Sequence, residues 1–459
     1  MRTMRILMLL LVFSLSGCAF GPIEDMLSPP RLTEEQQAIY TALVTSKGSG
    51  FKLKYPRTGE HRSAFVVYGD KKDAALVFYE ISGINIERSL LMNFLYKDSD
   101  GRWESQYEIP IWGNDIESVN FASFGEDNEE CIILSYTVGQ VGQGEKRCMI
   151  LRDIYSNPTR DFEDGYAYLS VDYFLGREYK ELLIIKNERS VQAATATFYT
   201  YIGGRLFWVS KCELDSGADE YIGVTEGFIT ENVPALFINH RKYNSSDSYG
   251  TDVIFYRGRI LHNPIIGNLD NMDKTFRRTS IVTELANPRD IDASGIFLLP
   301  SSAGEFPGYE TMPAQERLRP VEWSKLEGDT LVGKYRSYYT ERCGFVFLLP
   351  EKWYDTVTAI VSIEDNTVSF YRAGMPIDEV DELIFGIKTI FRDEELPNPE
   401  EWRYFKQSED GSFRYYINRA ESEDALLLSA EELENSFRIL SEIEYEPILE
   451  DEAFSGFSE

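Results

Sequence analysis

The stretch that decides the fold is 172-DYFLGREYKELLIIKN-187, in which a polar corner leads directly into an apolar run. Residues 182–185 are apolar at every position, and the run is far too short to cross a membrane. A short continuous apolar segment that follows turn residues is typical of a strand covered on both faces. We therefore expect a buried β-strand after this corner.

Weaker copies of this plan recur along the chain, each with a strand, a polar corner and a strongly apolar strand. They are 63-SAFVVYGDKKDAALVFYE-80, 118-SVNFASFGEDNEECIILSY-136, 221-YIGVTEGFITENVPALFIN-239 and 280-SIVTELANPRDIDASGIFLLP-300. If Ala74, Glu130, Glu181, Pro234 and Ser294 are equivalent corner positions, the intervals are 56, 51, 53 and 60 residues. Repeats of about 50 residues are typical of a β-propeller or a solenoid.

Hairpins between the corners complete a four-stranded unit. Residues 89–98 and 102–112 flank an Asp-Gly pair, and residues 194–202 and 205–214 flank a Gly-Gly pair, which suit tight hairpin turns. Four strands per repeat make one propeller blade, whereas β-solenoids usually have shorter repeats. We expect a mainly β chain, with a β-propeller of about five four-stranded blades, in a range of five to seven, over residues 51–340. A β-sandwich or several separate β-domains is the alternative.

The corner plan resembles the FG-GAP, or integrin-alpha-like, repeat family, in which spaced acids at the corner often bind calcium. The resemblance implies a propeller and a calcium site wherever the acids are kept. Four corners lack the alternating acids, and only 290-DIDASG-295 keeps spaced oxygen ligands, at Asp290, Asp292 and Ser294. No Glu stands at the twelfth position of this loop, so an EF-hand ligand set is incomplete. The corner can be interpreted as a calcium site or as a plain Asx turn.

Two further folded elements are predicted outside the repeats. Thr33-Glu-Glu-Gln36 makes a capping box for an amphipathic helix over residues 32–47. Residues 341–443 predict six strands and then a helix, which indicates a small C-terminal α+β domain. Its order of an F-x-L-P-x-x-W motif, a sheet and a final helix looks like the PsbP or Mog1 type of sandwich. Residues 444–459 form an acidic tail.

The N-terminus predicts export and a lipid anchor. A basic start and an apolar segment at residues 6–15 fit a secretory signal peptide over residues 1–17, since the segment is too short for a transmembrane helix. The sequence 15-LSGC-18 resembles the bacterial lipobox, which implies that Cys18 carries a diacylglyceryl thioether and begins the mature chain. Residues 18–31 then form a tether. The expected location is the extracytoplasmic face of the cell membrane; a cleaved signal followed by an ordinary Cys is the alternative.

The other four cysteines, Cys131, Cys148, Cys212 and Cys343, form no CxxC pair, so zinc is not expected. An even number of cysteines in an exported chain permits disulfides, but the sequence does not choose a connectivity. A buried free thiol at Cys131 fits its apolar surroundings equally well.

Charge and motif content argue against several functions. The formal net charge of −30 repels phosphate backbones, so nucleic acid is not an expected partner. The three histidines belong to no HExxH or HxH array, and no GxSxG elbow or GxxxxGK[ST] loop occurs. Paired carboxylates could still act on glycans, but among 76 acidic residues the sequence identifies no pair. No catalytic or cofactor-binding residue is therefore assigned.

The arrangement as a whole resembles a family of lipoproteins of clostridial, Gram-positive bacteria. The features that carry this are the lipobox, the proline-containing tether, the helix 32-LTEEQQAIYTAL-43, the entry 54-KYPRTGEHRSAF-65 and the C-terminal motif. The resemblance covers nearly the whole chain and implies an address and a fold, but no activity. We expect a non-catalytic binding or scaffold module whose ligand is an envelope protein or a glycan. The alternative is a lipid-anchored, glycan-acting enzyme with paired carboxylates in a propeller pocket.

Overall fold

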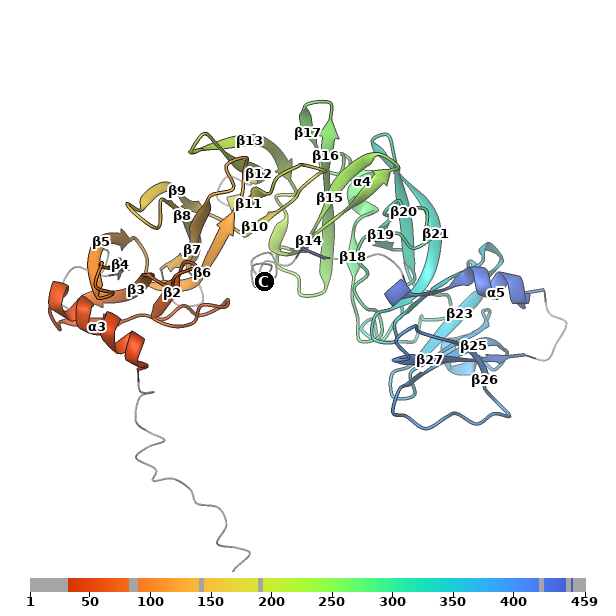
Figure 1. Ribbon diagram of the computed structural model, residues 1–459. Coiled ribbons are helices and arrows are strands. Elements are labelled where there is room, and N and C mark those ends of the chain that lie inside the picture. Colours follow the sequence, from red (N-terminus) through yellow and green to blue (C-terminus); the bar gives the residue numbers. More distant parts are fainter. Residues whose placement is uncertain are drawn as a thin grey trace, which may run out of the picture. The chain divides into compact units, whose positions relative to one another are not determined.

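The structure, a computed structural model, describes residues 32–81, 90–139, 144–188, 193–420, 425–442 and 447–448. Strands make up 51% of it and helices 9%, which confirms the mainly β class (Figure 1). The chain divides into two compact units. The first holds the N-terminal residues up to Arg57 with His61–Ile116 and Tyr155–Asn157, and the second holds Thr58–Glu60, Glu117–Ile154 and the chain from Pro158 onward.

The first unit is an antiparallel sheet with a helix packed against it. Helix α3 (Glu34–Lys47) begins with the predicted capping box, in which Thr33 Oγ1 accepts from the Gln36 N–H and the Gln36 side chain accepts from the Thr33 N–H. Ile39 and Leu43 are fully buried against the sheet. The strands are β1 (Phe51–Leu53), β2 (Phe65–Tyr68), β3 (Ala74–Ile81), β4 (Leu90–Lys97) and β5 (Trp103–Ile111), in the order β1-β3-β4-β5 with β2 beside β3.

The next three sheets are each built on four strands that follow one another in sequence. The first contains β6 (Asp115–Ser123), β7 (Glu130–Val138), β8 (Glu145–Arg152) and β9 (Thr159–Gly165), and the second contains β10 (Tyr168–Asp172), β11 (Glu181–Glu188), β12 (Ala193–Ile202) and β13 (Arg205–Leu214). The third contains β14 (Ala218–Thr230), β15 (Val233–Lys242), β16 (Ser248–Arg257) and β17 (Ile260–His262), with β18 (Arg277–Arg278) beside β16 and β29 (Pro447–Ile448) beside β14. Helix α4 (Leu269–Asp273) follows β17.

Two sheets follow in the C-terminal part. One has the order β19 (Leu299–Ser302), β20 (Val321–Glu327), β21 (Thr330–Thr340), β22 (Phe345–Leu348) and β28 (Phe437–Ile439). The other has the order β23 (Val357–Ser362), β24 (Thr367–Arg372), β25 (Leu383–Phe391), β27 (Phe413–Arg419) and β26 (Arg403–Gln407). Helix α5 (Ala430–Ser436) begins with a capping box of Ser429 and Glu432. The short 3-10 turns are η3 (Glu351–Trp353), η4 (Ile377–Glu379) and η5 (Leu440–Glu442). Because β22 pairs with β21, one sheet contains strands from both sides of the predicted domain boundary at Thr340.

Four of the five predicted corners lead into a buried strand. β3, β7 and β11 begin at Ala74, Glu130 and Glu181, and β15 begins one residue before Pro234. In β11, alternate residues contribute to two different apolar clusters: residues 182 and 184 to one, residues 183 and 185 to the other. This strand is therefore covered on both faces, which is why its sequence does not alternate.

The fifth corner differs from the prediction. Residues 279–298 contain no strand, only the single bridge between Arg289 and Leu298. The apolar segment after this corner becomes β19, the first strand of its sheet and not the second. Its neighbour β20 begins only after a long connection, residues 303–320, and local sequence patterns do not report pairing across such a distance.

Apolar clusters in the second unit join consecutive sheets. Ile133 of β7 shares a cluster with Leu182 of β11, Ile185 of β11 with Ile238 of β15, Phe237 of β15 with Leu299 of β19, and Phe345 of β22 with Phe370 of β24. The sheets thus contact one another through their faces, as stacked layers of side chains.

The structure tests the prediction for the four cysteines but not the prediction for the N-terminus. Cys131, Cys148, Cys212 and Cys343 are buried free thiols, so the structure contains none of the permitted disulfides among them. Cys18, the signal peptide and nearly all of the tether lie outside the described residues, as does most of the acidic tail. Within the described ranges, the helices are too short or too polar to span a bilayer.

Candidate ligand-binding cleft

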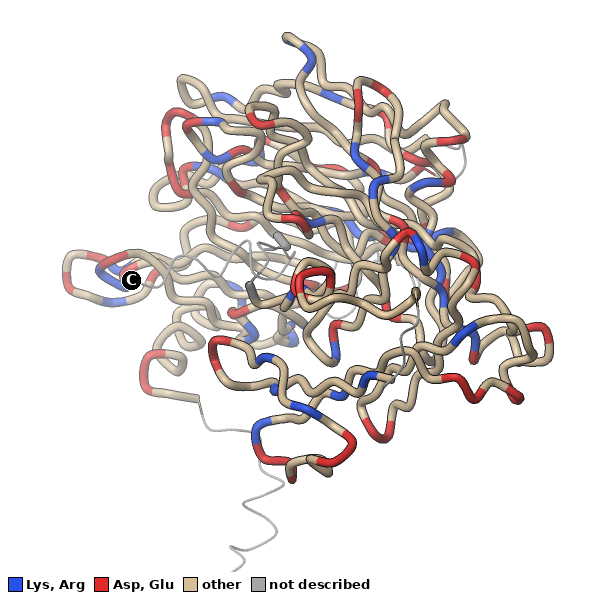
Figure 2. Tube along the Cα trace, turned by 90° about the vertical axis from the view of Figure 1, so that its right-hand side faces the viewer, with Lys and Arg blue, Asp and Glu red and all other residues tan. Residues whose placement is uncertain are grey.

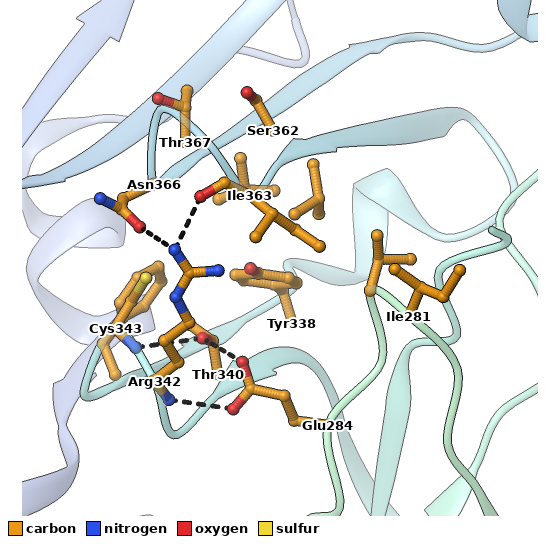
Figure 3. Close-up of a pocket in the computed structure, with 14 residues that line it drawn as sticks. Ile281, Glu284, Tyr338, Thr340, Arg342, Cys343, Ser362, Ile363, Asn366 and Thr367 are labelled. Atoms are coloured by element: carbon orange, nitrogen blue, oxygen red, sulfur yellow. Dashed lines mark hydrogen bonds between the residues drawn. The ribbon is translucent and has the colours of Figure 1, made fainter. Parts of the chain in front are cut away.

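A cleft of about 230 Å³ lies at the junction of the last two sheets of the second unit. Three segments line it: residues 281–284, the end of β21 with its turn into β22, and the hairpin from β23 to β24. Figure 3 shows side chains from all three segments facing a common space. The cleft therefore depends on long-range packing and not on one local motif.

Glu284 holds the turn between β21 and β22 in place. One oxygen of its carboxylate accepts from Thr340 Oγ1 at 2.9 Å, and the other accepts from the backbone N–H groups of Glu341 and Arg342 at 2.6 and 2.9 Å. Gly344 completes the turn at φ +70°, where a Cβ would also meet the Phe413 ring at 2.8 Å. The acid thus fixes the backbone from which Arg342 extends.

Arg342 brings a guanidinium group to the cleft. Its Nη2 donates to the carbonyl oxygen of Ile363 and to Asn366 Oδ1, both at 2.8 Å, as the dashed lines in Figure 3 mark. Asn366 lies in the left-handed region at φ 51°, a conformation that Asn tolerates better than most residues in a tight turn. No partner for Arg342 Nη1 or Nε is found within the described residues, so these donors are available to a ligand.

The remaining wall of the cleft is mostly apolar. Tyr338, Phe345 and Val368 are buried and belong to the core cluster between the two sheets. Val361 is half-buried at the end of β23, while Ile281 is 64% exposed at the mouth. Apolar walls beside a few directed polar groups are typical of a small-molecule site.

The titratable groups of the cleft suit binding better than group transfer. Burial raises the pKa of the Cys343 thiol, so it is held in its neutral, weakly nucleophilic form. Burial also raises the pKa of the Tyr338 hydroxyl. Among the described residues that line the cleft, none is a histidine. An arginine and a glutamate beside an apolar wall can instead hold a ligand by charge and shape.

The predicted calcium residues lie outside this cleft and have protein partners. Asp290 accepts from the backbone N–H groups of Ser294 and Gly295 at 2.9 and 2.6 Å, which is a capped turn. Asp292 accepts from Lys334 Nζ at 2.5 Å and from the Tyr335 hydroxyl at 3.1 Å. In the part of the chain that the structure describes, no three His, Cys, Asp or Glu side chains are grouped as metal ligands. These observations do not test calcium binding, so the calcium site and the plain Asx turn both remain interpretations of this corner.

The corner of residues 172–187 connects two sheets through Arg177. Its guanidinium lies 5.1 Å from the centroid of the Tyr256 ring, and Nη2 donates to the Tyr256 hydroxyl at 3.2 Å. Glu181, the first residue of β11, is 1% exposed and lies 3.8 Å from Arg177 Nε. Burial raises the pKa of Glu181 to about 7, and the arginine only partly opposes this shift. Burial likewise raises the pKa of Glu226, on β14, to about 7.

A buried histidine lies between two carboxylates in the third four-stranded sheet. His240 is 1% exposed; its Nε2 lies 3.5 Å from Asp215 and its Nδ1 3.6 Å from Asp252. Lys242 also pairs with Asp215. Asp252 is fully buried and accepts from Asn263 Nδ2 at 2.8 Å, and burial raises the pKa of this carboxyl group. Because His240 is enclosed, we interpret the group as a structural network that joins three segments.

Sequence reasoning found neither the cleft nor the histidine network. Glu284 and Arg342 are 58 positions apart, and no local pattern connects them. His240 gave a weak signal, as a titratable residue directly after the apolar run 235-ALFIN-239.

No protein-family model matches the chain, and a search of curated proteins finds no similar sequence.

Proposed function

We propose that the chain is a lipid-anchored, extracytoplasmic lipoprotein that binds a small ligand without transforming it. In this proposal the four-stranded sheets are blades of a β-propeller, and the cleft beside Arg342 is the ligand site. Cys18 carries the lipid, and the membrane is the first partner.

The repeat of strand order supports the propeller. Sheets with the orders β6-β7-β8-β9 and β10-β11-β12-β13 have the meander of a blade, and consecutive sheets share apolar clusters. The spacing of the sequence corners, at about 50 residues, agrees with that arrangement.

The single observation that carries the binding function is the cleft itself. It combines an apolar wall with a guanidinium that has unused donors, and its one cysteine thiol is neutral. Its volume suits a small molecule better than a protein surface or a long glycan, although the ligand expected from sequence was an envelope protein or a glycan.

The glycan-acting alternative would need two carboxyl groups that face one substrate. Glu181 and Glu226 are the natural candidates, because a pKa of about 7 suits a general acid. Glu181 is only 1% exposed, however, and a residue so covered cannot touch a sugar. We therefore favour binding over hydrolysis.

The charge distribution supports the absence of nucleic acid among the partners. Acidic residues occur at many loop tips of the chain trace, with basic residues scattered among them (Figure 2). With a net charge of −30, this surface offers little to a phosphate backbone.

The function is tested by a small-molecule screen observed through methyl NMR of the full chain. We expect hits that shift the methyl signals of Val361 and Val368, and we expect the Val368 shifts to vanish in Val361→Phe, which fills the cleft. The proposed site would be refuted by hits that bind Val361→Phe as tightly as the wild type, or by a screen in which no compound shifts the cleft methyl signals. Intact mass of the membrane-extracted chain tests the anchor: we expect lipid on Cys18 and an unmodified, released Cys18→Ala.

A further inference from the structure

We infer that the ligand of the cleft is a free α-amino acid with a branched apolar side chain, such as leucine. This inference rests on the proposed binding function and adds the chemical class of the ligand. It follows from the charges, the size and the surroundings of the cleft.

The cleft presents one positive and one negative group. Arg342 keeps Nη1 and Nε for an incoming acceptor, and these donors suit a carboxylate. One oxygen of the Glu284 carboxylate has a single donor, the Thr340 hydroxyl, and a carboxylate oxygen can accept a second hydrogen bond. Figure 3 shows Thr340 between Arg342 and Glu284, with Tyr338 next to the Arg342 guanidinium and Ile281 farther to the right. A ligand with a carboxylate, an ammonium group and an apolar body would satisfy all three features.

Net charge favours a zwitterion over a simple acid. A monocarboxylate would approach a chain with a formal charge of −30, and long-range repulsion would oppose it. A zwitterion carries no net charge, so it avoids this penalty and still offers a carboxylate to Arg342. Its ammonium group would in addition gain from Glu284.

The size of the cleft sets the size of the ligand. At about 30 Å³ for each water-sized group, a volume of about 230 Å³ holds roughly eight such groups, close to the size of valine or leucine. Tyr338, Val361 and Ile281 would contact the side chain, and none of them offers a charge to a polar one.

A free amino acid fits better than the end of a peptide. β23 is the edge strand beside the cleft, but the Tyr309 hydroxyl already donates to the carbonyl oxygen of Ala359 on that strand at 2.5 Å. An added peptide strand would have to displace this contact. A terminal residue of a peptide also carries only one of the two charges, whereas the free amino acid carries both.

The test is a titration of the full chain with three probes: L-leucine, 4-methylpentanoate, which lacks the ammonium group, and 3-methylbutylamine, which lacks the carboxylate. We expect L-leucine to bind at least about tenfold more tightly than either analogue, since each lost charged hydrogen bond weakens binding by that order. Arg342→Gln should weaken L-leucine by a similar factor but should not weaken 3-methylbutylamine. Arg259→Gln, at an exposed hairpin tip, is the matched control and should bind as the wild type does.

Glu284→Gln should weaken L-leucine but should not weaken 4-methylpentanoate. Because Glu284 also holds the turn at Thr340, a thermal unfolding measurement checks that this variant folds. If the variant does not fold, the test rests on the three ligands measured with the wild type and with Arg342→Gln. The inference falls if 4-methylpentanoate equals L-leucine, or if Arg342→Gln binds L-leucine normally. If L-leucine does not bind but another small molecule shifts the methyl signals of the cleft, the proposed ligand class is wrong and the proposed binding function stands. If no molecule binds at the cleft, the ligand class and the binding function are both wrong.

Discussion

Replacing Glu181 by Gln should remove a pH-dependent loss of stability at the corner of residues 172–187. Glu181 begins β11, is 1% exposed, and has Asp172 opposite it in the strand pair. Its Oε1 has no hydrogen-bond donor within the described structure, and Arg177 Nε remains 3.8 Å away. A carboxyl group so placed is stable when protonated and costly when ionised.

The size of the effect follows from the pKa. Burial raises the pKa of Glu181 from 4.5 to about 7, and a shift of roughly 2.5 units at 1.36 kcal/mol each corresponds to about 3 kcal/mol. The folded state keeps the proton while the unfolded state has lost it, so stability falls as the pH rises from about 4.5 to about 7. Above that range both states are ionised and the full cost remains.

Amide hydrogen exchange of β11 at pH 5 and pH 8, corrected for intrinsic rates, measures this cost locally. We expect the wild type to lose about 2.5 kcal/mol more opening free energy between the two conditions than Glu181→Gln does. Glu178→Gln removes an exposed carboxylate from the same corner and should behave as the wild type does. If Glu181→Gln keeps the wild-type pH dependence, the buried carboxyl is not its source and the reasoning fails.

Three other predictions concern packing, burial and metal. Gly125→Ala should lower stability by about 2 kcal/mol more than Gly203→Ala, measured by chemical unfolding, because a Cβ at Gly125 would meet the Tyr201 backbone N at 2.4 Å while one at Gly203 meets nothing within 4 Å; equal losses would contradict this. Asp252→Ala should cost about 3 kcal/mol in the same assay, since it leaves buried donors without an acceptor, and a loss below about 1 kcal/mol would argue against the network. Millimolar calcium should not change the thermal midpoint, because Asp290 already accepts two backbone N–H groups, and a saturable rise would refute that.

The strands and helix starts were predictable because they depend on local patterns. The apolar run after Glu181 predicted a strand covered on both faces, and alternate residues of β11 do enter two clusters. The capping box at Thr33 begins α3 as expected, because the cap is a contact between residues three positions apart.

Pairing over long distances was not predictable in the same way. The fifth corner was expected to join two strands, yet β19 has its partner only after residues 303–320, and that choice depends on the apolar face shared with Phe237 and Leu326. The cleft is a consequence of the same kind of packing. Glu284 reaches the turn at Thr340 only because the irregular segment that holds it lies against the final sheets, and no spacing in the sequence encodes this contact.

The burial of polar side chains was also not predictable from the sequence. Glu181 was interpreted only as a corner position, and nothing in its sequence neighbours indicated that its carboxyl group would be covered. His240 follows an apolar run, but its two carboxylate neighbours come from β16 and from the connection after β13. Electrostatic environments of this kind are set by the tertiary structure and not by the local pattern.

The most direct test of the binding account is a methyl NMR titration of the full chain with L-leucine. We expect saturable shifts confined to the methyl groups of the cleft, including Ile281, Val361 and Val368, and a midpoint about tenfold higher in Arg342→Gln. Saturable shifts at another site, or shifts at the cleft that persist unchanged in Arg342→Gln, would contradict it.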